Sequence, residues 1–184
     1  MKISETALPG VLLIELQIFA DARGSFMETW RWDRYEEHGV PTRFVQDNIS
    51  FSLHGVLRGL HFQNPHGQGK LIHVLQGEIF DVAVDIRLGS PTFGQWLGVT
   101  LSEYNHHQLY VPDGFAHGFC VLSATALVSY KCTDVYHPQS EGGILWNDPD
   151  LGIKWPISRP LLSPKDAAFP RLREIAQGRL PRHQ

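Results

Sequence analysis

The sequence of 184 residues predicts an all-β protein, a sandwich or a barrel built from short strands. Short runs rich in Val, Ile, Leu and aromatic residues recur along the chain, and Gly, Pro and Asp separate them. Strands of this length and spacing are typical of sandwiches and barrels. Because neither an internal repeat nor a linker is visible, we expect residues 1–184 to form a single domain with its own core.

The predicted strands follow these apolar runs in chain order. We expect them at residues 11–16, 43–52, 56–62, 70–75, 78–86, 96–101, 108–111 and 126–136. Turn residues support the breaks between them, notably Gly77 and the segments 89–91 and 112–114. The chain therefore reverses direction often, as antiparallel sheets require.

Helices are predicted at only two places. The first covers residues 33–38. The second lies near the C-terminus, where Ser163 has the side chain of an N-cap and Pro164 suits the first helical position. Pro170 must end or kink this second helix.

Charge and composition exclude several classes of function. The net charge is −3 and the pI is about 6.3, and the Lys and Arg residues are scattered along the chain. Nucleic-acid and membrane-surface proteins need a basic stripe, so we expect neither partner. No apolar stretch approaches the ~20 residues that span a bilayer. Cys120 and Cys132 are too few for a disulfide framework and no signal segment opens the chain, so we expect a soluble cytoplasmic protein.

One short segment groups side chains that no strand needs for its own structure. Arg58 and His61 lie in the predicted strand 56–62, and Lys70 begins the next strand. Arginine binds phosphate or carboxylate with two parallel hydrogen bonds, and imidazole moves protons near neutral pH, so the grouping predicts proton chemistry on an anionic substrate. A regular strand would point Arg58 and His61 to opposite faces. A bulge at Gly59 would return them to one face.

The predicted strand 43–52 carries a row of polar side chains. Gln46, Asn48 and Ser50 share one face of this strand, and Val45 and Ile49 share the other. A row of amides that faces inward needs a polar ligand, because buried polar groups are costly without hydrogen bonds.

Part of a metal-binding pattern surrounds His61. Barrels of the cupin type often bind a metal through Gly-x5-His-x-His and a later Pro-x-Gly-x-x-His. Gly55 and His61 fit the first half, but Gln63 replaces its second histidine; the second half is complete and ends at His117. Transition metals usually have at least three His or carboxylate ligands, so we expect no bound metal. A metal-dependent cupin oxygenase is the alternative that this pattern leaves open.

Six separated blocks of sequence resemble one family of enzymes. They are residues 21–28, 46–50, 56–63, 91–96, 114–119 and 140–148, in the family's order and over nearly the whole chain. The family is that of the dTDP-4-dehydrorhamnose 3,5-epimerases. The resemblance implies an all-β jelly-roll domain of the cupin (double-stranded β-helix) type with short C-terminal helices, working as a homodimer without metal or other cofactor.

The resemblance also implies the catalytic residues. His61 matches the base, and Asp166 matches the carboxylate that orients its ring. Tyr130 matches the proton donor on the far face of the sugar, and a phenol with an ordinary pKa of about 10 carries a proton at pH 7. Lys70 matches the lysine that meets negative charge on the keto oxygen.

A second set of residues matches the family's positions for binding the sugar nucleotide. Arg23, Arg58 and Lys165 resemble residues that hold the pyrophosphate or its surroundings. Tyr136 resembles the aromatic side chain that stacks on thymine. The other members of the set are Glu28, Gln46, Asn48, His117 and Glu141.

The implied reaction inverts carbons 3 and 5 of dTDP-4-dehydro-6-deoxy-D-glucose and gives dTDP-4-dehydro-L-rhamnose, a step of dTDP-L-rhamnose biosynthesis. Both carbons flank the C4 ketone, so loss of either proton gives an enolate, and reprotonation from the opposite face inverts the centre. Relatives that invert only one carbon, in other deoxysugar pathways, keep the same His, Asp and Tyr, so a mono-epimerase is the main alternative. A non-catalytic module that binds a sugar nucleotide is a further one.

Overall fold

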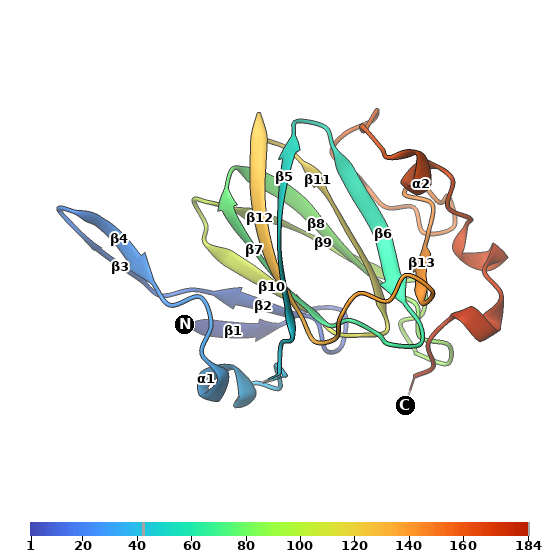
Figure 1. The fold of residues 1–184 in the computed structure, drawn as a ribbon, viewed down its shortest axis with the longest axis horizontal. Coiled ribbons are helices and arrows are strands. Elements are labelled where there is room, and N and C mark those ends of the chain that lie inside the picture. Colours follow the sequence, from blue (N-terminus) through green and yellow to red (C-terminus); the bar gives the residue numbers. More distant parts are fainter. Residues whose placement is uncertain (42, 184) are drawn as a thin grey trace.

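Two antiparallel sheets face one another in the computed structural model, which describes residues 1–41 and 43–183 (Figure 1). The first sheet has the order β1 (Lys2–Glu5), β2 (Leu12–Glu15), β10 (His107–Val111), β7 (Lys70–Gln76), β12 (Thr125–Cys132) and β5 (Gln46–Leu53). The second has the order β13 (Glu141–Gly143), β6 (Leu57–Gln63), β11 (Phe115–Val121), β8 (Glu78–Asp85) and β9 (Trp96–Ser102). Strands β5 to β8, and again β10 to β12, alternate between the two sheets. This is the jelly-roll arrangement that the family resemblance implied.

The main core lies between the two sheets. Alternate side chains of each strand point into this layer, and burial stabilises the fold by ~1.5–3 kcal/mol for each fully buried large apolar side chain. The core residues from both sheets include Ile72, Val74, Ile79, Ala83, Leu101, Leu109, Phe115, Phe119 and Val128.

The second sheet is also covered on its outer face, by the C-terminal part of the chain (Figure 1). Leu60, Val82 and Ala116 of this sheet pack there against Ile144 and Leu172. All seven residues of β11 are consequently buried. A strand buried on both faces has no polar alternation, which explains why the sequence did not predict β11.

Every predicted strand is confirmed, but several real strands were missed. The missed ones are β1, β11, β13 and the hairpin of β3 (Ile18–Asp21) and β4 (Gly24–Met27). They are short, or buried on both faces, or wholly exposed, so each lacks a clear period of two. The predicted strand 126–136 was too long. Strand β12 ends at Cys132, and beyond it Gly69 N donates to the side-chain Oγ1 of Thr133 at 2.8 Å, which interrupts the backbone ladder with β7.

The predicted helices are confirmed and are short. Helix α1 (Trp32–Glu36) packs its Tyr35 into a small apolar cluster beside β2 and β10. Helix α2 (Pro164–Ala167) has Ser163 as N-cap, and the hydroxyl oxygen of Ser163 accepts from Asp166 N at 3.0 Å. Two 3-10 turns follow, η1 (Leu172–Glu174) and η2 (Gln177–Arg179). No helix in the described ranges is long and apolar enough to cross a membrane.

The β3–β4 hairpin extends away from both sheets (Figure 1). Its strands pair only with each other, and nearly every residue in it is exposed. Phe19 and Phe26 lie on it with their rings 6.5 Å apart, although both are large apolar side chains in contact with solvent. An exposed apolar arm of this kind is typical of a segment that packs on a partner.

Candidate active site

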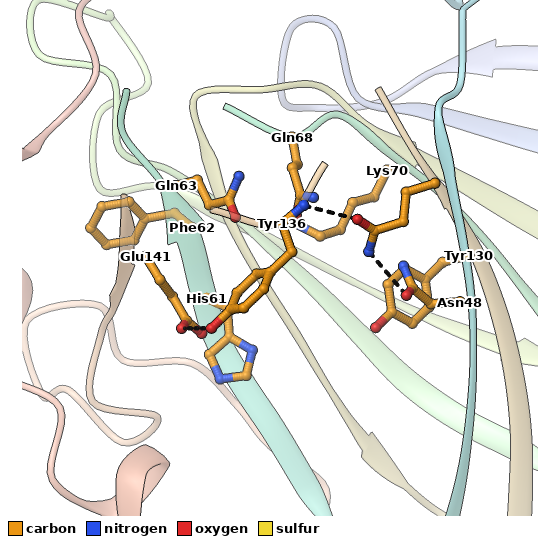
Figure 2. A pocket seen from close by; sticks show the side chains of 10 residues that line it. Asn48, His61, Phe62, Gln63, Gln68, Lys70, Tyr130, Tyr136 and Glu141 are labelled. Atoms are coloured by element: carbon orange, nitrogen blue, oxygen red, sulfur yellow. Dashed lines mark hydrogen bonds between the residues drawn. The ribbon is translucent and has the colours of Figure 1, made fainter. Parts of the chain in front are cut away.

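A cleft opens between the two sheets and contains most of the polar residues that the sequence singled out. Its main cavity is about 310 Å³ and is drawn in Figure 2. Its walls are formed by Gln46, Asn48, His61, Phe62, Gln63, Gln68, Lys70, Tyr130, Tyr136 and Glu141. A smaller cavity of about 150 Å³ shares His61, Lys70 and Tyr130 and adds Ser50, Arg58, His117 and Phe119. The two cavities therefore adjoin along these three shared residues.

His61 and Tyr130 face the cleft from opposite sheets (Figure 2). His61 lies on β6 of the second sheet, whereas Tyr130 lies on β12 and Lys70 on β7 of the first. A molecule held between the sheets would thus meet an imidazole on one side and a phenol on the other. This geometry suits removal of a proton from one face and delivery to the other.

His61 is bonded to a buried carboxylate. Its Nε2 lies 2.7 Å from Oδ1 of Asp166, and the side chains are 35% and 6% exposed respectively. Burial raises the pKa of Asp166, but the hydrogen bond with His61, aided by Gly59 N and Ser163, outweighs this and lowers the pKa overall. Asp166 therefore stays ionised and holds the ring of His61 with its other nitrogen free to act.

The predicted bulge at Gly59 is confirmed. His61 pairs with His117 of β11, but Arg58 pairs with Phe119, so β6 has one residue more than β11 between these points. A side chain at Gly59 would place its Cβ 2.7 Å from both Gly118 Cα and His117 O, so only glycine allows this approach. The extra residue brings Arg58 and His61 to one cavity, although a regular strand would separate them.

Lys70 presents its amine to both cavities. Burial lowers the pKa of Lys70, and the opposing effects of Cys132, Asp81 and Glu141 only partly offset this. An amine that burial makes more acidic donates a proton or a hydrogen bond more readily to a nearby oxyanion. Its place beside His61 and Tyr130 suits that task.

Tyr130 remains a neutral phenol at the cleft. Burial raises the pKa of its hydroxyl group, and Arg58, which opposes the shift, does not reverse it. The proton is therefore retained at neutral pH and is available for transfer to a carbanion.

The polar row on β5 faces the cleft, as predicted. Gln46 Nε2 donates to Asn48 Oδ1 at 3.0 Å, and Gln46 Oε1 accepts from Tyr136 N at 2.8 Å (Figure 2). Ser50 lines the smaller cavity. Ile49, on the opposite face of the strand, is 67% exposed.

The rim of the cleft carries a chain of three polar side chains. Tyr136 Oη donates to Glu141 Oε2 at 2.5 Å, and Lys165 Nζ lies 2.5 Å from the same oxygen. The bond to Glu141 raises the pKa of Tyr136, so this phenol is also neutral. Burial raises the pKa of Glu141, but the bonds from Lys165 and Tyr136 outweigh it and lower the pKa overall. The ring of Tyr136 is thus fixed across the mouth of the main cavity.

Asp81 belongs to the site, and sequence reasoning missed it. His117 Nε2 lies 2.9 Å from both carboxylate oxygens of Asp81, and both residues are buried. The cleft therefore has a second histidine–carboxylate pair, whose His117 lines the smaller cavity. The signal was an Asp flanked by apolar residues in the middle of the predicted strand 78–86, since a buried charge needs a partner. Gln68 was missed too, because it lies in a loop without any pattern.

The two halves of the damaged cupin motif meet in the structure. His61 and His117 are direct partners across β6 and β11, but the Nε2 atom of each is bonded to a carboxylate. The side-chain amide of Gln63, at the position of the missing histidine, bonds to backbone groups of two loops. Its Nε2 donates to His66 O at 2.7 Å, and its Oε1 accepts from His137 N at 2.9 Å. That this cleft works without a metal stays a prediction.

Two predicted binding residues lie away from this cleft. Arg23 is at the tip of the β3–β4 hairpin, where its side chain is 89% exposed and lies 2.6 Å from Asp21. Glu28 follows the hairpin and pairs with Arg34 at 3.0 Å. Neither side chain lines the cleft of its own chain.

The sequence is similar to that of one known family of enzymes. The family model described as dTDP-4-dehydrorhamnose 3,5-epimerase matches residues 5–174. A protein of that name from Salmonella typhimurium is 55% identical over 175 residues, which are 94% of this chain and 96% of the relative. One from Neisseria gonorrhoeae is 57% identical over 169 residues, 91% of this chain, and the chain spans only 52% of that relative's length.

A solved structure is also very similar. The crystal structure of dTDP-6-deoxy-D-glucose-3,5-epimerase from Legionella pneumophila, in complex with dTDP-4-keto-L-rhamnose, has a TM-score of 0.97 and 56% identity. The match covers 100% of this chain and 98% of that chain.

The jelly roll and its cleft define an enzyme of the cupin type. The match of the family model over residues 5–174, together with a relative that aligns over 96% of its length, shows which enzyme family this is. The chain belongs to the dTDP-4-dehydrorhamnose 3,5-epimerase family.

Proposed function

We propose that this protein epimerises dTDP-4-dehydro-6-deoxy-D-glucose at C3 and C5 to dTDP-4-dehydro-L-rhamnose. The observation that carries the proposal is the placement of His61, which is bonded to Asp166, and Tyr130 on opposite sheets across one cleft, with Lys70 on the same sheet as Tyr130. Membership of the family and the ligand of the Legionella relative support this choice of substrate.

In the proposed steps, Asp166 and Tyr130 each act in the protonation state that their surroundings favour. His61 removes the proton from a carbon beside the ketone, and ionised Asp166 stabilises the resulting imidazolium. Lys70 meets the negative charge that develops on the keto oxygen, a contribution of roughly 3 kcal/mol by analogy with an oxyanion donor. Tyr130 then delivers its proton from the opposite face, which inverts the centre. His61 then releases its proton to solvent and the phenolate of Tyr130 takes up a proton from solvent, which burial favours by raising its pKa. The same groups, so restored, act at the second carbon.

The nucleotide half is proposed to lie at the mouth of the cleft. Tyr136, fixed by Glu141, offers its ring to thymine, a contact worth roughly 1–3 kcal/mol. Gln46 and Asn48 offer amides beside it, and Arg58 offers a guanidinium group to the diphosphate.

We propose that the protein is a homodimer. Strand β5 is the edge of the first sheet, and its outward face carries Ile49, Phe51 and Leu53, each more than half exposed. A continuous apolar stripe on an edge strand favours a partner that covers it. The β3–β4 hairpin extends away from both sheets of its own chain (Figure 1). In a dimer, Arg23 and Glu28 of one copy would therefore lie near the cleft of the other copy. This accounts for two binding residues that are otherwise far from the cleft.

We also propose a cytoplasmic location. Cys120 and Cys132 are both free and buried, and burial raises the pKa of Cys120 to about 11. Neither thiol is used for a structural bond, as is usual in a reducing compartment. Cell fractionation beside marker enzymes of each compartment tests the location.

The reaction is tested by incubating the enzyme with dTDP-4-dehydro-6-deoxyglucose in deuterated water with a chelator present. We expect deuterium at both C3 and C5 and formation of the L-rhamno product by NMR. Exchange at one carbon only would assign a mono-epimerase. Binding of dTDP in calorimetry without exchange would assign a binding module, and loss of activity with the chelator would overturn the metal-free mechanism.

A further inference from the structure

Two histidines and one aspartate converge outside the catalytic pairs. His66 lies in the loop between β6 and β7, and Asp134 and His137 lie in the loop between β12 and β13. Asp134 Oδ2 is 3.6 Å from His66 Nδ1, and its Oδ1 is 3.8 Å from His137 Nε2. The imidazole rings stack with centroids 4.1 Å apart. One ligand atom from each of the three residues lies within 4.8 Å of the others.

These spacings suit a shared ion better than they suit hydrogen bonds. At 3.6 and 3.8 Å the carboxylate oxygens are too far from the ring nitrogens for a hydrogen bond. Ligands of a tetrahedral Zn²⁺ at ~2.0–2.1 Å stand ~3.3 Å from one another. The two imidazole rings, which are stacked at an angle of 23°, must also turn apart to hold one ion between them, because a ring nitrogen binds a metal in the plane of its own ring.

We propose that His66, Asp134 and His137 bind a divalent transition metal of the Zn²⁺ type. Two imidazoles and one carboxylate form a ligand set that proteins use for zinc, with a remaining position open to water. All three side chains are partly exposed, so an ion can enter from solvent and keep a water ligand. The site is separate from the damaged cupin motif, whose histidines His61 and His117 are bonded to Asp166 and Asp81.

The backbone around the cluster is already held in place. Gln63 bonds both loops at once, through His66 O at 2.7 Å and His137 N at 2.9 Å. Gln68 Nε2 donates to Asp134 O at 2.8 Å. Fixed ligand positions favour metal binding, because little further ordering is needed when the ion binds.

The ion would join two loops at the rim of the cleft. Tyr136 lies between Asp134 and His137 in the chain, and its ring forms part of the cleft wall together with Gln63 and Gln68 (Figure 2). The metal would thus fix the segment that carries Tyr136 without contacting the catalytic pair. Its role is structural, and it takes no part in the proton transfers.

Calorimetric titration of untagged, chelator-treated protein with ZnCl₂ tests the site. We expect one ion bound per chain, and a rise in melting temperature when Zn²⁺ is added. Asp134→Asn keeps the size of the side chain and the oxygen that accepts from Val135 N, but removes the charge. Because the loss of a supporting residue alone weakens metal sites by ~10–100-fold, we expect Asp134→Asn and His137→Gln to weaken binding by at least ~100-fold.

The matched control is His106→Asn. His106 is the other non-glycine residue with positive φ besides His66 among the described residues, and it lies outside the cluster. This variant should bind Zn²⁺ as the wild type does. Far-UV circular dichroism without metal checks that each variant is folded. The proposal is overturned if the wild type binds no Zn²⁺, or if Asp134→Asn and His137→Gln, folded, bind it with unchanged affinity.

Discussion

Nε2 of His61 lies 2.7 Å from Oδ1 of Asp166, although the two residues are 105 positions apart in the chain. The strand β6 supplies the imidazole, and the short helix α2, capped by Ser163, supplies the carboxylate, which also accepts from Gly59 N. The pair is assembled only when the C-terminal segment packs on the outer face of the second sheet. The proposed chemistry depends on this pair, and the first prediction tests it.

His61→Asn should lower the rate of deuterium exchange at both C3 and C5 by ~100- to 10,000-fold, because the amide is not basic at neutral pH. Exchange into the keto sugar, followed by NMR, measures the rate. His54→Asn is the matched control, since His54 is exposed and bonds only to carbonyl oxygens of Leu122 and Ser123. Wild-type exchange in His61→Asn would show that another group is the base.

Tyr130→Phe should separate exchange from inversion. The base would still remove protons, so exchange continues at one or both carbons, but no phenol delivers a proton to the opposite face. Product analysis of the same NMR samples measures inversion independently of exchange. Inversion of both centres at the wild-type rate in this variant would reject Tyr130 as the acid.

Lys70→Met should lower kcat/KM by ~100-fold, which is the ~3 kcal/mol expected for the loss of an oxyanion donor. Methionine is unbranched and only one atom shorter than lysine, so it fills most of the same space without a charge. Lys131→Met is the control, because Lys131 is next to Tyr130 in β12 but is paired with Asp47 at 3.0 Å. Equal losses in the two variants would mean that charge at Lys70 has no special role.

Phe51→Lys should give a monomer with little activity. The side chain is 60% exposed on the outward face of β5, so a lysine there leaves the fold intact but places a charge in the proposed dimer contact. Light scattering after size-exclusion chromatography measures the mass. Tyr104→Lys, at an exposed apolar position in the loop after β9, should remain dimeric and active. A dimeric Phe51→Lys protein would place the interface elsewhere.

Asp85→Asn should destabilise the fold in a pH-dependent way. Burial alone would raise the pKa of Asp85, but bonds from Arg87, Ser90 and Thr92 lower it to about 2. Because the folded pKa lies below the ordinary value of about 3.9, the ionised group stabilises the fold above pH ~4. This contribution, of order 2 kcal/mol, is lost as the pH falls from ~4 through ~2.

Urea unfolding of Asp85→Asn and wild type at a series of pH values measures the effect. The difference in free energy of unfolding should be largest near neutral pH and should shrink towards pH 2. Asp150→Asn, whose partner Arg173 is 3.4 Å away on the surface, should show little difference at any pH. A difference for Asp85→Asn that does not vary with pH would exclude its charge as the cause.

Much of the site was predictable because strand patterns are local. The alternation along residues 46–50 gave the inward row of Gln46 and Asn48 correctly, since successive side chains on a strand always point to opposite faces. Gly59 indicated the bulge for a similar reason: a glycine within an apolar strand marks a place where regular pairing fails. The residue types predicted proton chemistry, and the family resemblance supplied their roles.

Other parts of the site depend on contacts between distant segments. Asp81 pairs with His117 from a neighbouring strand, and His66 meets Asp134 and His137 from another loop, so no short pattern could bring them together. Arg23 matches the family's pyrophosphate position, yet it lies on the β3–β4 hairpin, which projects away from the two sheets (Figure 1). Its place near a cleft depends on a second copy.

The sequence by itself determined the strands with a clear apolar run, the inward face of residues 46–50 and the chemistry that the polar residues can perform, because these follow from side-chain type and the period of two. The tertiary structure alone decided that Asp166 contacts His61, and that Asp81 supports His117. It also placed Arg23 far from its own cleft. Such contacts depend on strand order and on the path of the C-terminal segment, which are set by the burial of the whole core.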